Sequence, residues 1–322
     1  MAQIIMRKTC LILIFFLLGG CLETDKAKHI LGESMGTTYS VNVLGDERVQ
    51  QEAIERRLLE INALFSTWQD GSEISRFNDA PIGDWIKVSD EFFQLLKTSE
   101  TVYFQTSGFF DSGIGRLIDL WGFGAKGGRT SVPQREEVNA AFENSSIKYV
   151  EFGEGQVKKT RDIHLNLSAI AKGYAVDEVA RIIESAGVKD FLVEIGGEVY
   201  ASGTNDGDEW TVGVERPDNK APIPIALNNA SVATSGNYRN YFIWEGEKYM
   251  HIFDPKSGLP ANNDLASVSV IHPRSALADA YATAMMAMGS EKAIELANEL
   301  ELSVLLMVIK GDNYQIIRVN LK

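Results

Sequence analysis

The stretch Phe191-Leu-Val-Glu-Ile-Gly-Gly-Glu-Val-Tyr-Ala-Ser202 holds two short apolar segments on either side of a glycine pair. Such segments are typical of two strands joined by a tight turn or a close backbone approach, because glycine adopts backbone conformations that other residues avoid. More strands are expected after this pair, at residues 210–215, 238–244, 249–253 and 266–271, with no helix between them. Strands that follow one another without helices favour antiparallel pairing over a doubly wound parallel sheet.

Helices are expected before and after this run of strands in the sequence. Apolar residues recur at helical spacing over residues 48–65, 90–106 and 170–186, and two Ala-rich helices are expected at 277–288 and 291–300. Further strands are expected at 38–43, 303–309 and 314–319. The sequence shows no internal repeat and no obvious linker. We therefore expect a mixed α/β (α+β) fold with largely antiparallel sheets flanked by helices.

Composition excludes several classes of protein. The 322 residues carry 31 Lys and Arg against 44 Asp and Glu, which gives a net charge of −13. A nucleic-acid-binding protein would show a basic face, so no nucleic-acid partner is expected. The two cysteines, Cys10 and Cys21, both lie near the N-terminus. A disulfide scaffold, a thiolate zinc site, an iron–sulfur cluster and a cysteine nucleophile are therefore excluded for the rest of the chain.

The first 21 residues resemble a bacterial lipoprotein leader. Arg7 and Lys8 precede an apolar run at 11–18, which is too short to span a bilayer because a spanning helix needs about 20 residues. Gly19-Gly20-Cys21 then resembles a lipobox, at which the leader is removed and the cysteine is lipidated. We expect a signal peptide at 1–20, a lipidated tether at 21–30 and the body of the protein at 31–322. An uncleaved anchor or a buried strand is the alternative.

Familiar catalytic motifs are absent from the sequence. It contains no G-x-x-x-x-G-K-[ST] loop, no complete dinucleotide fingerprint, no H-E-x-x-H and no G-x-S-x-G. Asp279 and Thr283 are four residues apart on an expected helix, so their oxygens project from one face. Such a pair can bind Mg²⁺, which takes few protein ligands alongside substrate phosphates. A solvated helix face is the simpler interpretation of these two residues alone.

Five blocks of sequence carry a more specific signal, because they occur together and in order. They are Met35-Gly-Thr-Thr-Tyr39; Phe65-Ser-Thr-Trp68 with Ser72-Glu-Ile-Ser-Arg-Phe-Asn78; Gly108-Phe-Phe-Asp111 with Leu120-Trp-Gly-Phe-Gly124; Leu167-Ser-Ala-Ile-Ala-Lys-Gly-Tyr174; and His251-Ile-Phe-Asp-Pro-Lys-Ser-Gly258. In order and spacing they resemble the ApbE family, the bacterial FAD:protein FMN transferases. The resemblance covers residues 33–320 and implies an ApbE-like fold for the body.

The resemblance implies a reaction and a metal site. The family splits the pyrophosphate of FAD, releases AMP and joins FMN through a phosphoester to a Thr or Ser hydroxyl of a partner protein. Its Mg²⁺ ligands correspond to the Ala169 carbonyl and the side chains of Asp279 and Thr283. Some members have a further carboxylate where this chain has Ala282, so one anionic ligand fewer is expected here.

The resemblance also implies which residues contact FAD. They correspond to Met35, Trp68, Phe109, Phe110, Asp111, Asn166, Lys172 and Phe253. Trp68 offers a ring for stacking. Lys172, near the start of an expected helix, suits a phosphate, although an ordinary exposed lysine is the alternative. At Asn166 other members have Asp, so the acceptor oxygen here carries no charge.

His251 is the best candidate for the base that accepts the hydroxyl proton. Histidine has an ordinary pKa of about 6.5, which suits proton transfer near neutral pH. A structural histidine at the end of a strand is the alternative interpretation.

The expected function is transfer of FMN from FAD, with Mg²⁺ as cofactor, at the periplasmic side of a bacterial membrane to which Cys21 anchors the chain. The implied acceptors are subunits of membrane electron-transfer complexes of the Na⁺-translocating quinone reductase or Rnf type. Two alternatives stay open. One is an FAD pyrophosphatase that uses water and yields FMN and AMP, and the other is a non-catalytic flavin-binding lipoprotein.

Overall fold

The computed structural model describes residues 28–44, 48–125, 128, 131–238 and 240–321. The expected signal peptide, Cys21 and most of the expected tether lie outside these residues. The first strand, β1 (Lys28–Ser34), begins inside the expected tether, so residues 28–30 are part of the folded body. None of the described helices is both long enough and apolar enough to cross a membrane.

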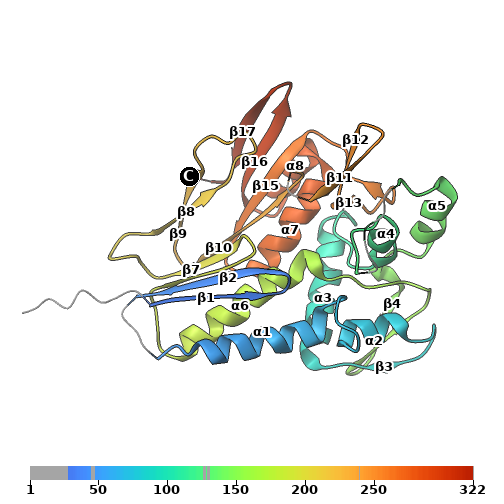
Figure 1. The fold of residues 1–322 in the computed structure, drawn as a ribbon, viewed down its shortest axis with the longest axis horizontal. Coiled ribbons are helices and arrows are strands. Elements are labelled where there is room, and N and C mark those ends of the chain that lie inside the picture. Colours follow the sequence, from blue (N-terminus) through green and yellow to red (C-terminus); the bar gives the residue numbers. More distant parts are fainter. Residues whose placement is uncertain (1–27, 45–47, 126–127, 129–130, 239, 322) are drawn as a thin grey trace, which may run out of the picture.

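Within the described residues, an antiparallel sheet of eight strands forms the centre of the molecule (Figure 1). Its order is β1-β2-β6-β7-β10-β15-β16-β17, and each neighbouring pair is antiparallel. The mixed α/β fold with antiparallel strands expected from the sequence is thereby confirmed. After β1, the strands are β2 (Thr37–Val43), β6 (Phe191–Ile195), β7 (Glu198–Ser202), β10 (Ala230–Gly236), β15 (Leu265–His272), β16 (Ser303–Lys310) and β17 (Asn313–Val319).

The two faces of this sheet are covered differently. Successive side chains of a strand point to opposite faces. In β16, Leu306 belongs to the large core that includes the helices, whereas Leu305 and Met307 pack in a second cluster with Trp210. The long helices of the large core are α1 (Gln51–Phe65), α3 (Asp90–Gln105), α6 (Ser168–Ser185), α7 (Ser275–Met288) and α8 (Ser290–Glu299), and the short α2 (Glu73–Asp79) adds Ile74 and Phe77. The hairpin of β8 (Trp210–Val214) and β9 (Ile223–Leu227) covers the other face.

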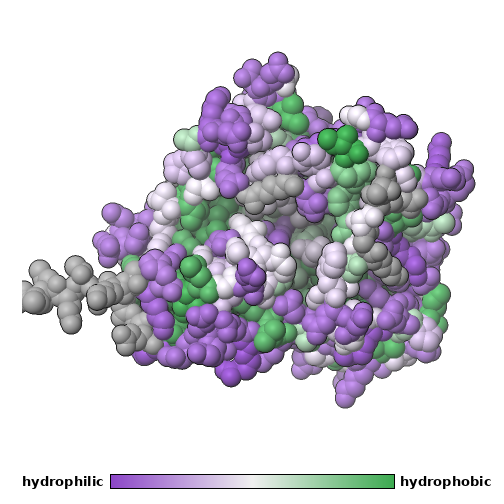
Figure 2. All heavy atoms as spheres, viewed as in Figure 1, coloured by the Kyte–Doolittle hydropathy of each residue, from purple (hydrophilic) through white to green (hydrophobic). Residues whose placement is uncertain are grey.

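Shorter elements complete the part of the molecule beside α3 and α7 (Figure 1). They are α2 (Glu73–Asp79), β3 (Ile86–Lys87), α4 (Gly115–Leu120), α5 (Arg135–Glu143), the 3₁₀ helix η1 (Ile147–Tyr149), β4 (Val150–Phe152), β5 (Gln156–Lys159), β11 (Tyr241–Trp244), β12 (Glu247–Met250), β13 (Phe253–Asp254) and β14 (Leu259–Pro260). A separate aromatic cluster around Trp121, Phe123 and Phe253 holds α4 and α5 against these hairpins. Figure 2 shows the apolar residues of one face as separate patches among hydrophilic side chains.

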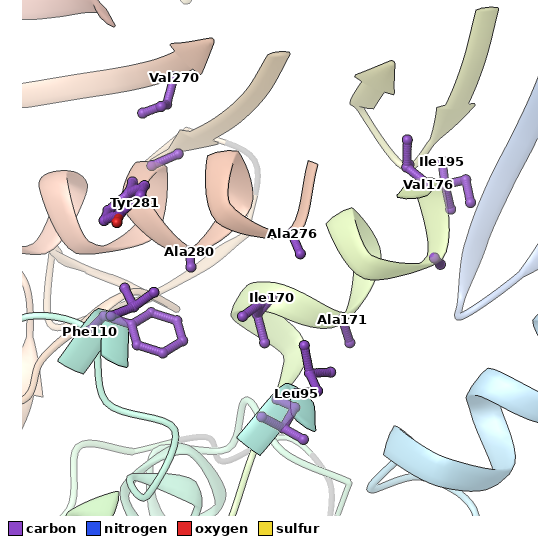
Figure 3. Close-up of a cluster of buried hydrophobic side chains, with 14 of the residues drawn as sticks. Leu95, Phe110, Ile170, Ala171, Val176, Ile195, Val270, Ala276, Ala280 and Tyr281 are labelled. Carbon is purple, nitrogen blue, oxygen red and sulfur yellow. The ribbon is translucent and has the colours of Figure 1, made fainter. Parts of the chain in front are cut away.

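Helices α6 and α7 approach each other closely at Gly173. A Cβ atom at Gly173 would lie 2.3 Å from the backbone oxygen of Ser275, so only glycine fits between the two helices. Four residues further along α6, Asp177 accepts hydrogen bonds from the backbone N–H groups of Ser275 (2.7 Å) and Ala276 (3.0 Å). These bonds satisfy donors that the start of a helix leaves free, and they fix the beginning of α7 on α6. Figure 3 shows the buried side chains that fill this contact, among them Ile170 and Ala280.

The strand β10 was not expected from the sequence, although it is central in the sheet. Its residues, Ala-Ser-Val-Ala-Thr-Ser-Gly, are small and lack a clear apolar alternation. Small residues fit in β10 because other elements pack on both faces of the strand. The hydroxyl of Ser231 donates to that of Ser275 on α7 at 2.8 Å, and Val232 packs with Trp210 of β8 on the other side.

Candidate active site

A buried group of charges lies where α6, α7 and β7 meet. The Nζ atom of Lys172 is 3.0 Å from Oε1 of Glu198 and 3.7 Å from Oδ2 of Asp279. Both carboxylates are only 3% exposed. Lys172 comes from α6, Glu198 is the first residue of β7 and Asp279 is on α7. Two buried acidic groups therefore share one ammonium, whose lysine side chain is 30% exposed.

The pKa values show how this group balances its charges. Burial raises the pKa of Glu198 to about 7 and also raises the pKa of Asp279, against the attraction of Lys172. For Lys172, burial lowers the pKa but the charges of Asp279 and Glu198 outweigh it, so the net shift is upward. Among the described residues, Oε2 of Glu198 is buried without a hydrogen-bond partner. A buried polar atom without a partner points to a missing ion, water or ligand group.

The expected metal ligands are on the facing turns of α6 and α7. Oδ2 of Asp279 accepts the backbone N–H of Gly173 at 3.1 Å. In a regular helix the Gly173 N–H donates to the carbonyl oxygen of Ala169. Here the same N–H also donates to Asp279, so the Ala169 carbonyl oxygen does not have this donor to itself. One turn along α7, Oγ1 of Thr283 is 3.1 Å from Oγ of Ser235 on β10. One carboxylate, one hydroxyl and one carbonyl are oxygen donors of the kind that Mg²⁺ takes together with water and phosphate.

The described residues hold no cluster of three or more His, Cys, Asp or Glu side chains that could bind a metal. Ala282, where some family members have a carboxylate, is fully buried and brings no oxygen. These residues fit Mg²⁺ with few protein ligands, and they do not fit a metal that needs nitrogen or sulfur donors.

His251 directly follows β12 and lies near Lys172. Its Nδ1 atom is 3.0 Å from the backbone oxygen of Asn240. A carbonyl oxygen only accepts, so Nδ1 carries the proton and Nε2 keeps the lone pair that a base needs. Burial lowers the pKa of His251, and the positive charge of Lys172 lowers it further, while the bond to Asn240 opposes the shift. His251 is therefore neutral at pH 7 and able to accept a proton.

The segments that carry Asp111 and Asn166 run side by side. The N–H of Asn166 donates to the backbone oxygen of Ser112 at 2.8 Å. Oδ1 of Asp111 accepts the N–H groups of Gly113 and Ile147, both at 2.7 Å. Burial raises the pKa of Asp111 to about 6, against these two bonds. In this structure the Asp111 carboxylate holds the loop together, and Asp111 also lines the adjacent cavity.

That cavity has a volume of about 430 Å³, and its lining includes three basic side chains and the acidic Asp111 and Glu143. Lys148, Arg161 and Lys256 line it with Asp111 and Tyr149. The guanidinium of Arg161 lies 4.3 Å from the centre of the Tyr149 ring. Cationic and aromatic groups together suit a ligand that is both anionic and planar.

The three phenylalanines expected to contact the flavin are all buried. Phe110 is buried near Ile170 and Ala280 (Figure 3), and Phe253 is buried against Trp121 and Phe123. A flavin contact at Phe110 or Phe253 would thus involve the backbone or follow a side-chain movement. The Phe109 ring is also largely buried, with Nζ of Lys256 4.2 Å from its centre.

Trp68 and Met35 lie just after the ends of α1 and β1. Trp68 is 70% exposed, so a face of its indole is free for stacking. The Asn62 side chain donates to Ser34 at 3.0 Å, which ties the end of α1 to the turn that carries Met35. The strand that follows this turn, β2, contacts the glycine pair, since Gly196 N donates to the oxygen of Thr38 at 3.1 Å.

Comparison with known proteins decides the family. The model of the ApbE family matches residues 35–306. This chain belongs to the ApbE family. A relative from Vibrio cholerae serotype O1, named FAD:protein FMN transferase, is 35% identical over 93% of this chain and 92% of its own length. A solved structure of the flavin transferase ApbE from Vibrio cholerae superposes with a TM-score of 0.86 at 33% identity, over 92% of this chain and 97% of that one. The apo form of the Pseudomonas stutzeri flavinyl transferase ApbE has a TM-score of 0.86 at 32% identity, over 92% and 96%.

In this ApbE family member, the structure brings together Lys172, Asp279 and His251, which the sequence analysis named as separate candidates. It adds Glu198, which that analysis missed. The sequence offered one signal, since Glu198 is an acidic residue directly after the glycine turn, at the start of a strand. Charged residues are seldom buried without a partner. The partner of Glu198, Lys172, is recognised only in the folded chain.

Proposed function

We propose that this chain transfers FMN from FAD to a Thr or Ser hydroxyl of a partner protein, with Mg²⁺ as cofactor, and releases AMP. The coarse activity follows from the family: the chain is an FAD:protein FMN transferase. The observation that best supports the finer reaction is that Lys172 pairs with Asp279 and its charge also acts on His251, whose Nε2 keeps its lone pair.

The proposed step is an in-line displacement at phosphorus. The partner's hydroxyl oxygen bonds to the phosphorus of the FMN half, and the bond from that phosphorus to the bridging oxygen of the pyrophosphate breaks. The hydroxyl proton passes to Nε2 of His251, and AMP leaves with the bridging oxygen. Lys172 stabilises negative charge on the phosphates. Mg²⁺ held by the Ala169 carbonyl, Asp279 and Thr283 would supply further positive charge for the pyrophosphate.

FAD binding in this proposal uses both edges of the site. Trp68 and Met35 offer an exposed ring and an apolar contact for the flavin, while Phe109, Phe110, Asp111, Asn166 and Phe253 border the site from the other side. The cavity beside Asp111, with its three basic side chains, suits the anionic, planar AMP half. An apolar pocket with a few polar groups is the usual form of a cofactor site.

The hydrolytic alternative uses water in place of the partner's hydroxyl and needs the same residues. A flavin-binding protein without catalysis would not need a neutral histidine beside a phosphate-binding lysine. The arrangement of His251 and Lys172 therefore favours an enzyme over a binding protein.

Metal removal and a candidate acceptor test the proposal. The full chain is mixed with FAD, Mg²⁺ and a candidate acceptor domain, and the acceptor is measured by intact mass spectrometry. We expect an added FMN mass and release of AMP, both abolished by EDTA. AMP released to the same extent without an acceptor would show the hydrolase instead. FAD that stays bound with neither product would leave only the binding protein.

We also propose that the chain is lipid-anchored through Cys21 on the periplasmic side of a bacterial membrane. There it would modify subunits of electron-transfer complexes of the Na⁺-translocating quinone reductase or Rnf type. The apolar run followed by Gly19-Gly20-Cys21 supports this place. In bacteria that express the Cys21→Ser variant, labelled palmitate should no longer enter the chain, whereas the natural sequence should take it up. Equal labelling of the two chains would overturn the anchor.

A further inference from the structure

Glu198 has no assigned role in the proposed reaction, yet it is the nearest partner of Lys172. We propose that Glu198 is a positioning residue: its carboxylate holds the Lys172 ammonium, so that Asp279 is released to take a divalent cation. The inference rests on the proposed function, because the cation is the Mg²⁺ of that reaction.

The distances support a division of labour between the two carboxylates. Lys172 Nζ is closer to Glu198 (3.0 Å) than to Asp279 (3.7 Å). A cation at Asp279 competes with the ammonium for the same oxygen and repels it. If Asp279 were its only partner, cation binding would leave a half-buried ammonium without a carboxylate partner, which is costly. Glu198 removes that cost because Lys172 already has a second, closer partner.

The backbone keeps Glu198 in place when Lys172 moves. Glu198 pairs with Ile195 across the turn between β6 and β7. The turn itself is fixed, because Gly196 N donates to Thr38 and Gly197 N donates to Oε1 of Glu194 at 2.7 Å. A carboxylate on such a rigid turn can hold an ammonium without following it.

The net charge of the group formed by Lys172, Glu198 and Asp279 also supports this role of Glu198. Two carboxylates and one ammonium give the group a net charge of −1 when all are ionised, and a divalent cation brings it to +1. Without the carboxylate of Glu198 these values would be 0 and +2, so the cation would bind less well in a site of low dielectric constant. Ala282 supplies no charge here, which makes Glu198 the second acidic side chain of this buried group.

The test is Mn²⁺ binding to the purified full chain without FAD, measured from the free Mn²⁺ signal by electron paramagnetic resonance. Mn²⁺ takes the same oxygen ligands as Mg²⁺. We expect Glu198→Gln to weaken Mn²⁺ binding about tenfold, since Lys172 then turns to Asp279. Adding Lys172→Met removes the competing ammonium, so the double variant should regain an affinity close to that of the natural chain.

The double variant separates positioning from direct coordination. If Glu198 were itself a ligand, the double variant would bind Mn²⁺ as weakly as Glu198→Gln, and the proposal would be overturned. Unchanged binding by Glu198→Gln would overturn it too. The matched control is Glu178→Gln. Glu178 is also buried, at 7% exposure, with Oε2 2.8 Å from Arg57, but it lies in a different ion pair. Its loss should lower the melting temperature and leave Mn²⁺ binding unchanged.

The Asp279→Asn variant distinguishes a wrong metal site from a wrong role for Glu198. We expect this variant to lose Mn²⁺ binding. If it binds as well as the natural chain, the metal site of the proposed function is wrong. If it loses binding while Glu198→Gln does not, the metal site stands and only the positioning role of Glu198 falls.

Discussion

Asp279→Asn should lower the rate of FMN transfer about a thousandfold while the chain stays folded. Asp279 is the one acidic side chain among the proposed Mg²⁺ ligands, and charge aimed at a transferring phosphate is worth several kcal/mol in such sites. The amide oxygen of asparagine can still accept the Gly173 N–H, and Lys172 keeps Glu198 as its partner. Transfer is measured as FMN mass added to the acceptor over time, and folding by circular dichroism.

Asp177→Asn is the matched control for this change. Asp177 also joins α6 to α7, through the N–H groups of Ser275 and Ala276, but it has no part in the buried charge group. Its loss should cost about 1 kcal/mol of stability, as for other helix caps, with transfer close to that of the natural chain. If both variants lost transfer equally, the Asp279 effect would be one of helix packing and not of charge.

His251→Ala should slow transfer by about 10²- to 10⁴-fold, the usual contribution of a general base, while FAD still binds. His251 must be neutral to accept the hydroxyl proton. Burial and the charge of Lys172 lower its pKa, so the neutral form persists below pH 6.5. In the natural chain the rate should therefore rise with pH through this lowered pKa and then level off. The variant should lack that rise. Stopped transfer reactions from pH 4.5 to 8 measure both profiles.

His272→Ala is the control for this pH profile. Burial lowers the pKa of His272 as well, and its Nδ1 accepts the backbone N–H of Arg274 at 2.9 Å. Because no proton transfer is assigned to His272, the variant should keep the acidic arm of the profile. FAD affinity is measured by flavin fluorescence. A His251→Ala variant that lost FAD binding and transfer in proportion would be defective in binding, and the base would have to be sought elsewhere.

Local pattern predicted the long helices and the strands around the glycine pair, because these elements have one buried face. The helices expected at 90–106 and 170–186 lie within two residues of α3 and α6, and the strand expected at 191–195 matches β6. The strands β9 and β10 were missed for different reasons. In β9 the buried residues alternate, but Pro224 between them argues against a strand; it is exposed on a short hairpin. In β10 both faces are covered, so small polar residues replace the alternation.

The site was predictable only in part, because its decisive contacts join distant segments. Helical spacing alone placed Asp279 and Thr283 on one face of α7, and the structure has them one turn apart on that helix. No local pattern could distinguish Lys172 from an exposed lysine. Its ion pairs with Glu198 and Asp279 depend on three elements that meet only in the folded chain.

This assembly from distant segments also sets the order of events during synthesis. Ser40 on β2 lies beside Glu194 on β6, 154 residues later, and α7 follows some eighty residues beyond that. Contacts of such long range form late, since closing large loops costs entropy. A chain still emerging from the ribosome therefore has no place for FAD until α7 has been made and has docked on α6. Under the proposed export of the unfolded chain, activity would begin only on the far side of the membrane, and the FAD of the cytoplasm would be left intact.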